Sequence, residues 1–488
     1  MNLAALIDAH PDDAAALRTA DGVVTYGQLR QSVAAARGVL AAKGIGPGDR
    51  VALVAENDPL FVIGYLATLG LGAVAVPLNP TSPAAELERE VDAVGAKAVV
   101  VGSGAGRAAV DGLLASRPAL ALVDDLAADA PPAPQLDTAD DDLAVLIFTA
   151  GTAGSPKAAM LSHGNLLSNL RQVQQHPGRA VVPGDVSLGI LPLFHIFGLN
   201  VVLGLMLMVG GSVALDARFE PRRTLALIRD QRVTLVAGAP PMYNAWANLP
   251  DDDAPGDSFA SVRLATSGAA PLPDEVAAAF TRRFGIPVHQ GYGLTEASPV
   301  VTSSLIDEPP RPGSIGVPLP GVEVRLIDEE GEDALVGDDG EIWVRGANVF
   351  QGYWQDADAT AAVLTSDGWL KTGDIGVADD TGHLWIVDRA KDLIIVNGFN
   401  VYPVEVEEAL LQLPGVTEVA VVGVPAASGE AVKAFVVKKD GAELSEQDVT
   451  EFAAGCLARY KTPTQVSFVP QLPHGLAGKL LRRELRSA

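Results

Sequence analysis

The feature that most constrains the fold of this chain is the alternation of short apolar runs with amphipathic stretches over about its first three hundred residues. The apolar runs have the length of buried strands, and the stretches between them have the spacing of helices with one buried face. This alternation predicts an α/β protein with layered, largely parallel sheets. The predicted strands are residues 51–54, 73–76, 97–101, 143–148, 186–191, 235–237 and 263–266, and the predicted helices are residues 26–42, 60–70, 222–231 and 274–283.

The sequence changes character after residue 312. Glycines then punctuate short alternating segments, such as VEVRLID and GEIWVRG, as far as residue 387, which predicts a small antiparallel β unit. From about Lys391 the pattern returns to mixed α and β, which predicts a separate domain. A stretch rich in Ala, Asp and Pro at residues 124–142 predicts a surface linker. The length of 488 residues agrees with more than one hydrophobic core.

Composition excludes several classes of function. Lys and Arg number 35 against 60 Asp and Glu, and the net charge of −25 disfavours nucleic acid and anionic membranes as partners. A single cysteine, Cys456, excludes a disulfide framework and thiolate zinc sites. The N-terminus lacks the pattern of a signal peptide, and the apolar stretch 201–215 is shorter than the roughly 20 residues of a spanning helix. We therefore expect a cytoplasmic protein without an integral membrane segment, in which 201–215 form a buried helix and strand.

The segment 148–165, FTAGTAGSPKAAMLSHGN, has the composition of a phosphate-binding loop. Its glycines let backbone N–H groups approach an anion, its threonines add hydroxyl donors, and its lysine adds a positive charge. The loop is not a Walker A motif, because Pro156 removes a donor and stiffens the exit from the loop. Taken alone, the same composition also suits an ordinary turn. The candidate phosphate-binding residues are Thr149, Ala150, Gly151, Thr152, Ala153, Gly154 and Lys157.

Six further segments complete a set of motifs. They are PLFHIFGL (192–199), SGAAPLP (267–273), QGYGLTE (290–296), LKTGD (370–374), DRAKDLIIVNGFNVYP (388–403) and GKLLRREL (478–485). In this order, and from about Thr25 to Arg486, the chain resembles the adenylate-forming superfamily of acyl-CoA synthetases, luciferases and peptide-synthetase adenylation domains. The stretch GFNVYPVEVEE at 398–408 resembles fatty acyl-CoA synthetases most, although 4-coumarate-type ligases carry similar stretches.

The resemblance implies both a fold and a reaction. The fold is an N-terminal domain at residues 1–390, with two layered α/β subdomains and a small β-barrel, followed by a mobile α+β lid domain at 391–488. The reaction is that of an ATP-dependent acyl-CoA synthetase for a medium- or long-chain fatty acid. The carboxylate attacks the α-phosphate of ATP and releases pyrophosphate, and the thiol of coenzyme A then attacks the acyl-adenylate and releases AMP. Mg²⁺ is the implied metal, and a homodimer is an accompanying expectation.

The resemblance also assigns roles to the reacting region. Lys479 is the implied adenylation lysine, which contacts the carboxylate and the α-phosphate. Glu296 is the implied ligand of Mg²⁺, with Thr152 as a second candidate ligand, and Thr295 is expected to contact the α-phosphate region. His195 is expected to position the acyl group and not to act as a general base, because a carboxylate needs no deprotonation at pH 7.

Nucleoside recognition and domain motion are implied at a second set of residues. Tyr292 is expected to pack on the adenine, and Asp374 and Arg389 are expected to contact the ribose, although a surface ion pair is the alternative for these last two. Lys391 is the implied pivot of the lid, and Gly398 is expected to leave room for the pantetheine arm. The remaining implied nucleotide or acyl contacts are Gly268, Ala269, Ala270, Gly291 and Gly293.

The phosphate loop departs from the family pattern. Ala150 replaces a hydroxyl residue, Ala153 replaces Thr, and Ala158 replaces Gly. Two hydroxyl donors are therefore lost, and a neutral hydrogen bond contributes about 0.5–1.5 kcal/mol net. We expect weaker ATP binding or slower adenylation, and not the loss of either.

Several other functions compete with the leading one. An aryl or 4-coumarate-type CoA ligase shares the motifs, and a fatty acyl-AMP ligase would pass its product to a carrier protein, although the insertion typical of those ligases is absent here. A non-catalytic acyl-adenylate sensor would explain Ala150 and Ala153, but Glu296 and Lys479 are retained.

The pocket motifs contain no arginine, which disfavours malonate-like acids. The candidate wall residues are Phe197, Leu199, Gly291, Gly293, Ala297 and Val300.

Overall fold

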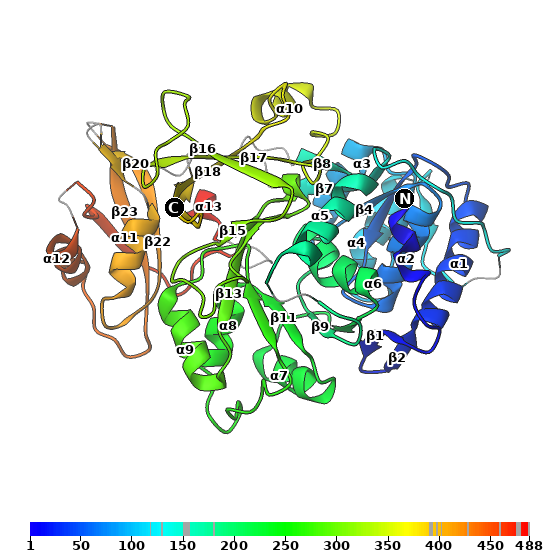
Figure 1. The fold of residues 1–488 in the computed structure, drawn as a ribbon, viewed down its shortest axis with the longest axis horizontal. Coiled ribbons are helices and arrows are strands. Elements are labelled where there is room, and N and C mark those ends of the chain that lie inside the picture. Colours follow the sequence, from blue (N-terminus) through cyan, green and yellow to red (C-terminus); the bar gives the residue numbers. More distant parts are fainter. Residues whose placement is uncertain are drawn as a thin grey trace.

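The computed structural model describes the whole chain except residues 118, 128–129, 150–156, 179–180, 390–393, 397–398, 402, 427–428, 458–459, 475–479 and 487–488. The described chain forms four sheets (Figure 1), and the N-terminal strands β1 and β2 belong to the second of them. Figure 1 places the N-terminal sheet at one end of the molecule, the second sheet in the middle and the C-terminal sheet at the other end. No helix among the described residues is long and apolar enough to cross a membrane.

The first sheet has the fully buried strands that the apolar runs predicted. Alternate residues of one strand pack on opposite faces: Val51 and Leu53 join one hydrophobic cluster, and Ala52 and Val54 join another. A strand buried on both faces reads as a continuous apolar run, which is why its sequence signal was clear. The strand order is β6 (Ala121–Val123), β5 (Ala98–Val101), β3 (Arg50–Val54), β4 (Val74–Pro77), β7 (Leu143–Thr149) and β8 (Lys157–Ser162).

Helices cover both faces of this first sheet. The helices of this region are α1 (Tyr26–Ala42), α2 (Pro59–Gly70), α3 (Ala84–Val94), α4 (Arg107–Ser116) and α5 (His163–Gln175). Thr25 caps α1 as predicted, in a reciprocal capping box with Gln28. The phosphate-loop candidate joins β7 to β8, which are antiparallel, so a strand lies between the loop and the start of α5.

The predicted linker at 124–142 is fastened to the domain. Arg37 of α1 donates through Nε to the carbonyl of Ala133 at 3.0 Å, and Asn2 donates to the carbonyl of Leu136 at 3.0 Å. Gly38 of α1 is needed there, because a Cβ atom would lie 2.3 Å from the carbonyl oxygen of Pro131. The stretch is therefore a surface connection, as predicted, and it is held against the domain by these contacts.

The second sheet is mostly parallel and occupies the middle of the molecule (Figure 1). Its order is β15 (Val317–Pro318), β14 (Val300–Ser303), β13 (Val288–Gly293), β12 (Leu264–Ser267), β11 (Leu235–Gly238), β9 (Val186–Gly189), β10 (Ser212–Leu215), β1 (Ala15–Thr19) and β2 (Gly22–Thr25). The helices are α7 (Pro221–Asp230), α8 (Pro240–Ala247) and α9 (Asp274–Phe284). The apolar stretch 201–215 forms parts of a π-helix η2 (Phe197–Gly204), then α6 (Leu205–Val209) and β10, which confirms the predicted buried helix and strand.

A four-stranded antiparallel sheet follows, where the glycine-punctuated segments predicted one. Its order is β16 (Val322–Ile327), β17 (Asp339–Gly346), β18 (Leu370–Ala378) and β19 (Leu384–Arg389), with α10 (Ala357–Val363) in the connection between β17 and β18. An isolated bridge between Gly316 and Leu384 ties β19 to the segment that leads into β15. This sheet therefore adjoins the second sheet.

The C-terminal part has a sheet and two hydrophobic clusters of its own. Its elements are β20 (Ile394–Val396), β21 (Phe399–Val401), α11 (Pro403–Leu411), β22 (Val416–Ala426), β23 (Gly429–Lys438), α12 (Glu446–Cys456), β24 (Gln465–Phe468) and α13 (Arg482–Arg486). A separate core agrees with a separate domain. The predicted boundary at residues 390 and 391 lies outside the described residues and stays a prediction.

Candidate active site

The candidate site lies where the carboxyl ends of strands from the first two sheets meet the four-stranded sheet. In open α/β sheets this edge is where ligands bind, because loops and helix starts there expose polar backbone groups. Two side-chain contacts hold predicted site residues here: Asp374 contacts Tyr292, which was also predicted, and Glu296 contacts Tyr353, which was not.

Tyr292 and Asp374 form the first of these contacts. The hydroxyl of Tyr292, on β13, donates a hydrogen bond of 2.6 Å to Oδ2 of Asp374, on β18. Both side chains are buried, with exposed fractions of 8% and 4%. Asp374 also pairs across the strands with Arg389 of β19, so the backbone brings the two predicted ribose contacts together. The side chain of Arg389 lies outside the described residues.

Glu296 lies in the short 3₁₀ helix η3 (Thr295–Ala297), directly after β13. Its Oε1 accepts a hydrogen bond of 2.7 Å from the hydroxyl of Tyr353, and its carbonyl accepts one of 2.8 Å from the backbone of Phe350. Thr295 precedes it on η3 and is half-buried. A carboxylate held in this way can offer its second oxygen to a cation.

Lys157 begins β8 at the exit of the phosphate-loop candidate. Its Nζ lies 5.1 Å from the centroid of the Tyr353 ring, a cation–π geometry. The Thr149 hydroxyl, on the entry strand, donates to the carbonyl of Lys157 at 3.4 Å. The loop between them, including Ala150, Gly151, Thr152, Ala153 and Gly154, lies outside the described residues, as do Lys391, Gly398 and Lys479.

The turn after β12 approaches the acyl-pocket candidates. A Cβ atom on Gly268 would lie 3.1 Å from Cε1 of Phe197, so only glycine lets this turn pass the ring without displacing it. Ala269 follows with a φ of 70°, and Ala270 is half-buried. The backbone at Gly268 therefore packs closely against the ring of Phe197, at the carboxyl end of β12 in the second sheet.

The glycines of the QGYGLTE segment also lie close to the chain's own backbone. A Cβ atom on Gly293 would lie 2.2 Å from the carbonyl oxygen of Pro299, and one on Gly291 would lie 3.1 Å from the carbonyl oxygen of Thr302. Contact with the chain's own antiparallel strand β14 therefore requires glycine at 293, independently of any ligand. Their approach to adenine or the acyl group stays a prediction.

His195 lies in the loop that joins β9 to η2 and is half-buried, with its ring 4.9 Å from that of Phe194. The residue that holds this loop belongs to none of the sequence motifs. Asn57, after β3, is buried and donates to the carbonyls of Gly189 at 3.1 Å and Leu191 at 2.8 Å. Its Oδ1 accepts from the backbone of Leu193 at 2.9 Å. Only a tertiary contact between two sheets reveals this role.

A group of buried amides holds the backbone after Glu296. Asn200 donates to the carbonyl of Ser298 at 2.8 Å, and Asn348 donates to that of Ala297 at 2.8 Å. Asn169 donates to the carbonyl of Val300 at 2.7 Å and accepts from its N–H at 3.1 Å. Because buried amides must be paired, these side chains leave the turn after Glu296 little freedom.

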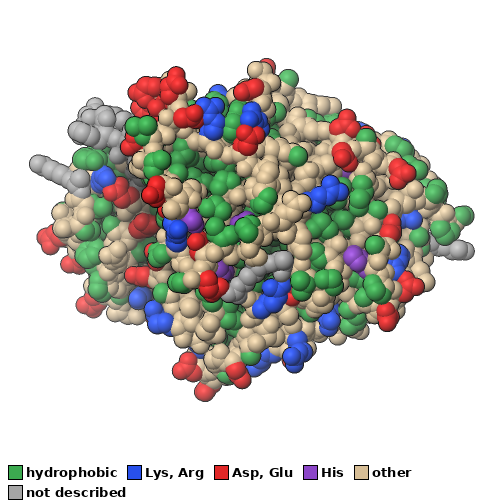
Figure 2. Space-filling model, in the orientation of Figure 1, with side chains coloured by type: hydrophobic (Ala, Val, Ile, Leu, Met, Phe, Trp, Pro, Cys, Tyr) green, Lys and Arg blue, Asp and Glu red, His purple; other side chains and the backbone are tan. Residues whose placement is uncertain are grey.

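The described residues fit a single magnesium ion bound with phosphates. Mg²⁺ commonly keeps several waters and takes one or two carboxylates together with phosphate oxygens. Glu296 supplies such a carboxylate, and no cluster of three or more His, Cys, Asp or Glu that suits a metal occurs among the described residues. The acidic side chains scattered over the face in Figure 2 agree with the net charge of −25.

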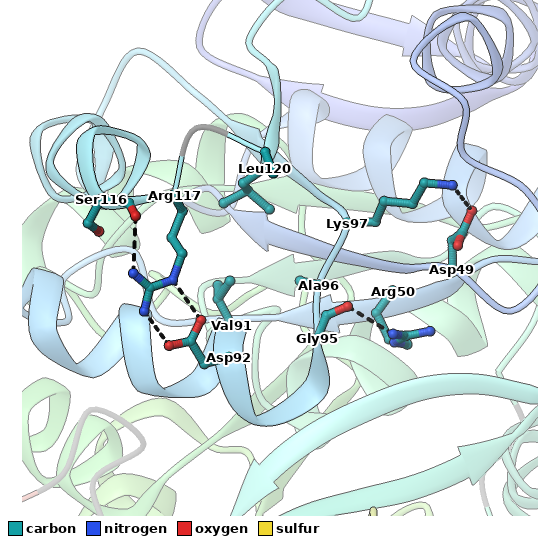
Figure 3. A pocket seen from close by; sticks show the side chains of 11 residues that line it. Asp49, Arg50, Val91, Asp92, Gly95, Ala96, Lys97, Ser116, Arg117 and Leu120 are labelled. Carbon is teal, nitrogen blue, oxygen red and sulfur yellow. Dashed lines mark hydrogen bonds and ion pairs between the residues drawn. The ribbon is translucent and has the colours of Figure 1, made fainter.

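A surface hollow of about 500 Å³ lies near the amino ends of strands β3 and β5 of the first sheet (Figure 3). Its cations are already engaged: Arg50 donates to the carbonyls of Val94 at 2.8 Å and Gly95 at 2.9 Å, and Lys97 pairs with Asp49 at 2.8 Å. Arg117 pairs with Asp92. Arg50 and Lys97 stand at the amino ends of strands, away from the edge that carries the candidate site.

Comparisons with known proteins identify the family of this chain. The sequence matches the AMP-binding enzyme family over residues 4–354 and the AMP-binding enzyme C-terminal domain over residues 405–479. It is 36% identical to a long-chain-fatty-acid–CoA ligase of Escherichia coli O157:H7, over 95% of this chain and 90% of the relative, and 39% identical to a feruloyl-CoA synthase of an Amycolatopsis species, over 97% and 95%. The fold is similar to that of ATP-bound MatB from Rhodopseudomonas palustris, with a TM-score of 0.93, 36% identity and coverage of 100% of this chain and 98% of MatB.

Proposed function

This chain belongs to the AMP-binding enzyme family of the adenylate-forming superfamily, and we propose that it is an ATP-dependent acyl-CoA synthetase for a medium- or long-chain fatty acid. The chain is an AMP-forming acyl-CoA ligase. The choice of acid, the metal and the individual residue roles are the proposal. The main observation in its support is that Tyr353 contacts both Glu296 and Lys157 at the exit of the phosphate-loop candidate.

The first half-reaction depends on stabilisation of negative charge more than on covalent catalysis. As the carboxylate attacks the α-phosphate, negative charge builds on the phosphate oxygens, and positioned donors and cations lower the barrier. Lys157 supplies a cation beside the loop, and Glu296 would hold Mg²⁺, which neutralises phosphate charge when bound. Thr295 would donate near the α-phosphate. Lys479 would contact the reacting carboxylate from the lid.

Asp374 and Arg389 would recognise the ribose. A carboxylate accepts hydrogen bonds from both sugar hydroxyls, and the phenol of Tyr292 orients it while the ring packs on the adenine. In this arrangement one side chain, Tyr292, serves both the base and the sugar. Burial of the pair makes the geometry rigid before ATP binds.

The second half-reaction needs room for a thiol. Rotation of the lid domain about Lys391 would remove Lys479 and bring Gly398 to the acyl tunnel, so that one site serves both steps. The separate core of residues 394–486 supports motion as a unit. Domain limits at 1–390 and 391–488 are part of this proposal.

The apolar character of the candidate wall residues favours a fatty acid. Leu199 is buried, Phe197 and Val300 are half-buried, and Phe197 closes on Gly268. The similarity to a bacterial long-chain-fatty-acid–CoA ligase points the same way. The second candidate is an aromatic acid, which the 39% identity to a feruloyl-CoA synthase favours.

The test is a product assay. The purified protein is incubated with ATP, Mg²⁺ and a panel of straight-chain and aromatic acids, with and without coenzyme A, and AMP, acyl-adenylate and acyl-CoA are measured by mass spectrometry. We expect acyl-CoA only when coenzyme A is present, for one band of fatty-acid chain lengths. Preference for aromatic acids would establish the second candidate. Adenylate without thioester would indicate a carrier-protein ligase, and no AMP with any acid would indicate a sensor.

A further inference from the structure

Tyr353 lies between two candidate phosphate-site residues but belongs to neither of their motifs. It follows β17 in the segment 350–354, and this segment runs antiparallel beside β8, the strand that leaves the phosphate loop. The N–H of Met160 donates to the carbonyl of Gly352 at 2.9 Å, and the N–H of Trp354 donates to that of Ala158 at 2.8 Å. The backbone of Tyr353 is thus fastened to the strand that Lys157 begins.

The side chain of Tyr353 contacts both candidates at once. Its hydroxyl donates a 2.7 Å hydrogen bond to Oε1 of Glu296, and its ring face lies 5.1 Å from Nζ of Lys157. It is 8% exposed and packs edge to face on Phe350, with the ring centroids 5.0 Å apart. One rigid ring therefore sets how far the candidate metal carboxylate lies from the candidate phosphate cation.

The hydroxyl of Tyr353 is the donor of this hydrogen bond, and the carboxylate of Glu296 is the acceptor. A phenol that donates to one oxygen of a carboxylate orients that carboxylate, so that its other oxygen can face a metal ion. Among the described residues, no hydrogen bond to Oε2 of Glu296 competes with a cation for that oxygen.

We propose that Tyr353 is a positioning residue of the adenylation step, which aims Glu296 at the magnesium ion through its hydroxyl and steadies Lys157 through its ring. This inference rests on the proposed function, because it concerns the binding of Mg²⁺ and ATP at the same site. The two contacts use different parts of one side chain. Substitutions can therefore separate them.

The experiment measures binding of a non-hydrolysable ATP analogue by titration calorimetry, in Mg²⁺ and in EDTA. Tyr353→Phe removes the hydroxyl and keeps the ring, so affinity in Mg²⁺ should fall about tenfold while affinity in EDTA stays unchanged. Tyr353→Leu removes both contacts, so affinity should fall in both conditions. Thermal melting of the unliganded variants reports any loss of folding.

The matched control is Tyr65→Phe, which removes the hydroxyl of another buried tyrosine, 5% exposed, in α2 of the first sheet region. It should leave both affinities unchanged. If Tyr353→Phe binds the Mg²⁺ complex as tightly as the wild type, or loses the same affinity in EDTA, the proposal is wrong. If Tyr353→Leu does not fold, the phenylalanine variant decides alone.

A failure of this inference can be told from a failure of the proposed function. Suppose that the wild type forms acyl-adenylate and that Tyr353→Phe binds the Mg²⁺ complex of the analogue as tightly as the wild type does. Only the role of Tyr353 would then be overturned. Wild-type protein that binds no nucleotide in either condition would overturn the proposed function and this inference together. If Mg²⁺ strengthens binding of the analogue in the wild type and clearly less in Tyr353→Phe, the result supports both the proposed function and this inference.

Discussion

The hydroxyl of Tyr292 lies 2.6 Å from Oδ2 of Asp374, and this hydrogen bond joins the last strand of the parallel region to the four-stranded antiparallel sheet. The two residues are separated by 82 positions in the chain. Because both are buried, the bond forms without competition from water and fixes the relation of two sheets at the candidate nucleoside site. A predicted adenine contact and a predicted ribose contact are thus one structural unit.

Tyr292→Phe should raise the KM for ATP and leave the KM for the acid unchanged. A hydrogen bond to a charged group contributes about 1.5–3 kcal/mol, so a rise of roughly ten- to hundredfold is expected. Steady-state kinetics with each substrate varied in turn provide the measurement. Tyr65→Phe is the control, and an equal rise in both KM values would mean that the variant perturbs the whole site.

Asn57→Ala should loosen the loop that carries His195. The substitution leaves the carbonyls of Gly189 and Leu191 and the N–H of Leu193 without their buried partner, and each unsatisfied group costs about 1–3 kcal/mol before water enters. We expect a lower melting temperature and a raised KM for the acid, with the KM for ATP nearly constant. Asn248→Ala, at an exposed amide bonded within its own helix turn, is the control. A raised KM for ATP alone would contradict this role.

Gly268→Ala should shift acyl selectivity. The new methyl group would lie 3.1 Å from Cε1 and 3.3 Å from Cζ of Phe197, so the ring of this candidate wall residue must move by a few tenths of an ångström. We expect kcat/KM for long acids to fall relative to that for short acids. Gly112→Ala, whose Cβ would meet only Ala84 at 3.9 Å, tests for a general effect of the substitution. An unchanged ratio would place the acyl tunnel elsewhere.

His163 should make the protein lose stability as the pH falls toward 4. Burial, and next the N-terminal ammonium, lower its pKa to about 4 from 6.5. The unfolded chain therefore binds a proton between about pH 6.5 and pH 4 that the folded chain does not, so stability is complete above 6.5 and is lost progressively down to about pH 4. The contribution reaches about 3 kcal/mol. Melting temperature as a function of pH provides the measurement.

The comparison variant for this titration is His163→Asn. An Asn side chain can accept the hydrogen bond that Nδ1 of His163 accepts from the N–H of Leu3, yet it cannot titrate. Its melting temperature should depend less steeply on pH over this range. The partly exposed His474 gives the control substitution, His474→Asn. Equal slopes for wild type and His163→Asn would show that other groups dominate.

Lys479→Ala should separate the two half-reactions. We expect acyl-adenylate formation to fall by about 10²-fold or more, as when one transition-state donor is removed, while thioester formation from supplied acyl-adenylate continues. Pyrophosphate release and acyl-CoA formation are followed separately. The control is Lys439→Ala, on the surface of the same domain after β23. Equal loss of both steps would remove Lys479 from the adenylation role.

The sequence determined the layers of sheets and helices in this protein and the set of residues that are candidates for binding and catalysis. Strands such as β3 are buried on both faces, so their apolar runs were visible without a structure. Helix α1 was visible from its cap at Thr25, α7 and α9 from their amphipathic spacing, and α2 from a stretch that is apolar on nearly all sides. Helices α3 and α4 were not predicted. The motifs also indicated the adenylate-forming superfamily, because phosphate and sugar recognition requires particular small and charged residues at short spacings.

Only the tertiary structure decided which of these residues meet. The contacts of Tyr353 with Glu296 and Lys157, and of Asn57 with the His195 loop, join segments 57 to 196 residues apart, and no local pattern encodes such distances. The fold also showed that Gly293 serves the packing of β14, a reason that the motif alone had hidden. Local periodicity reports burial and backbone geometry, whereas the pairing of polar side chains depends on how the sheets are stacked, which is a property of the whole chain.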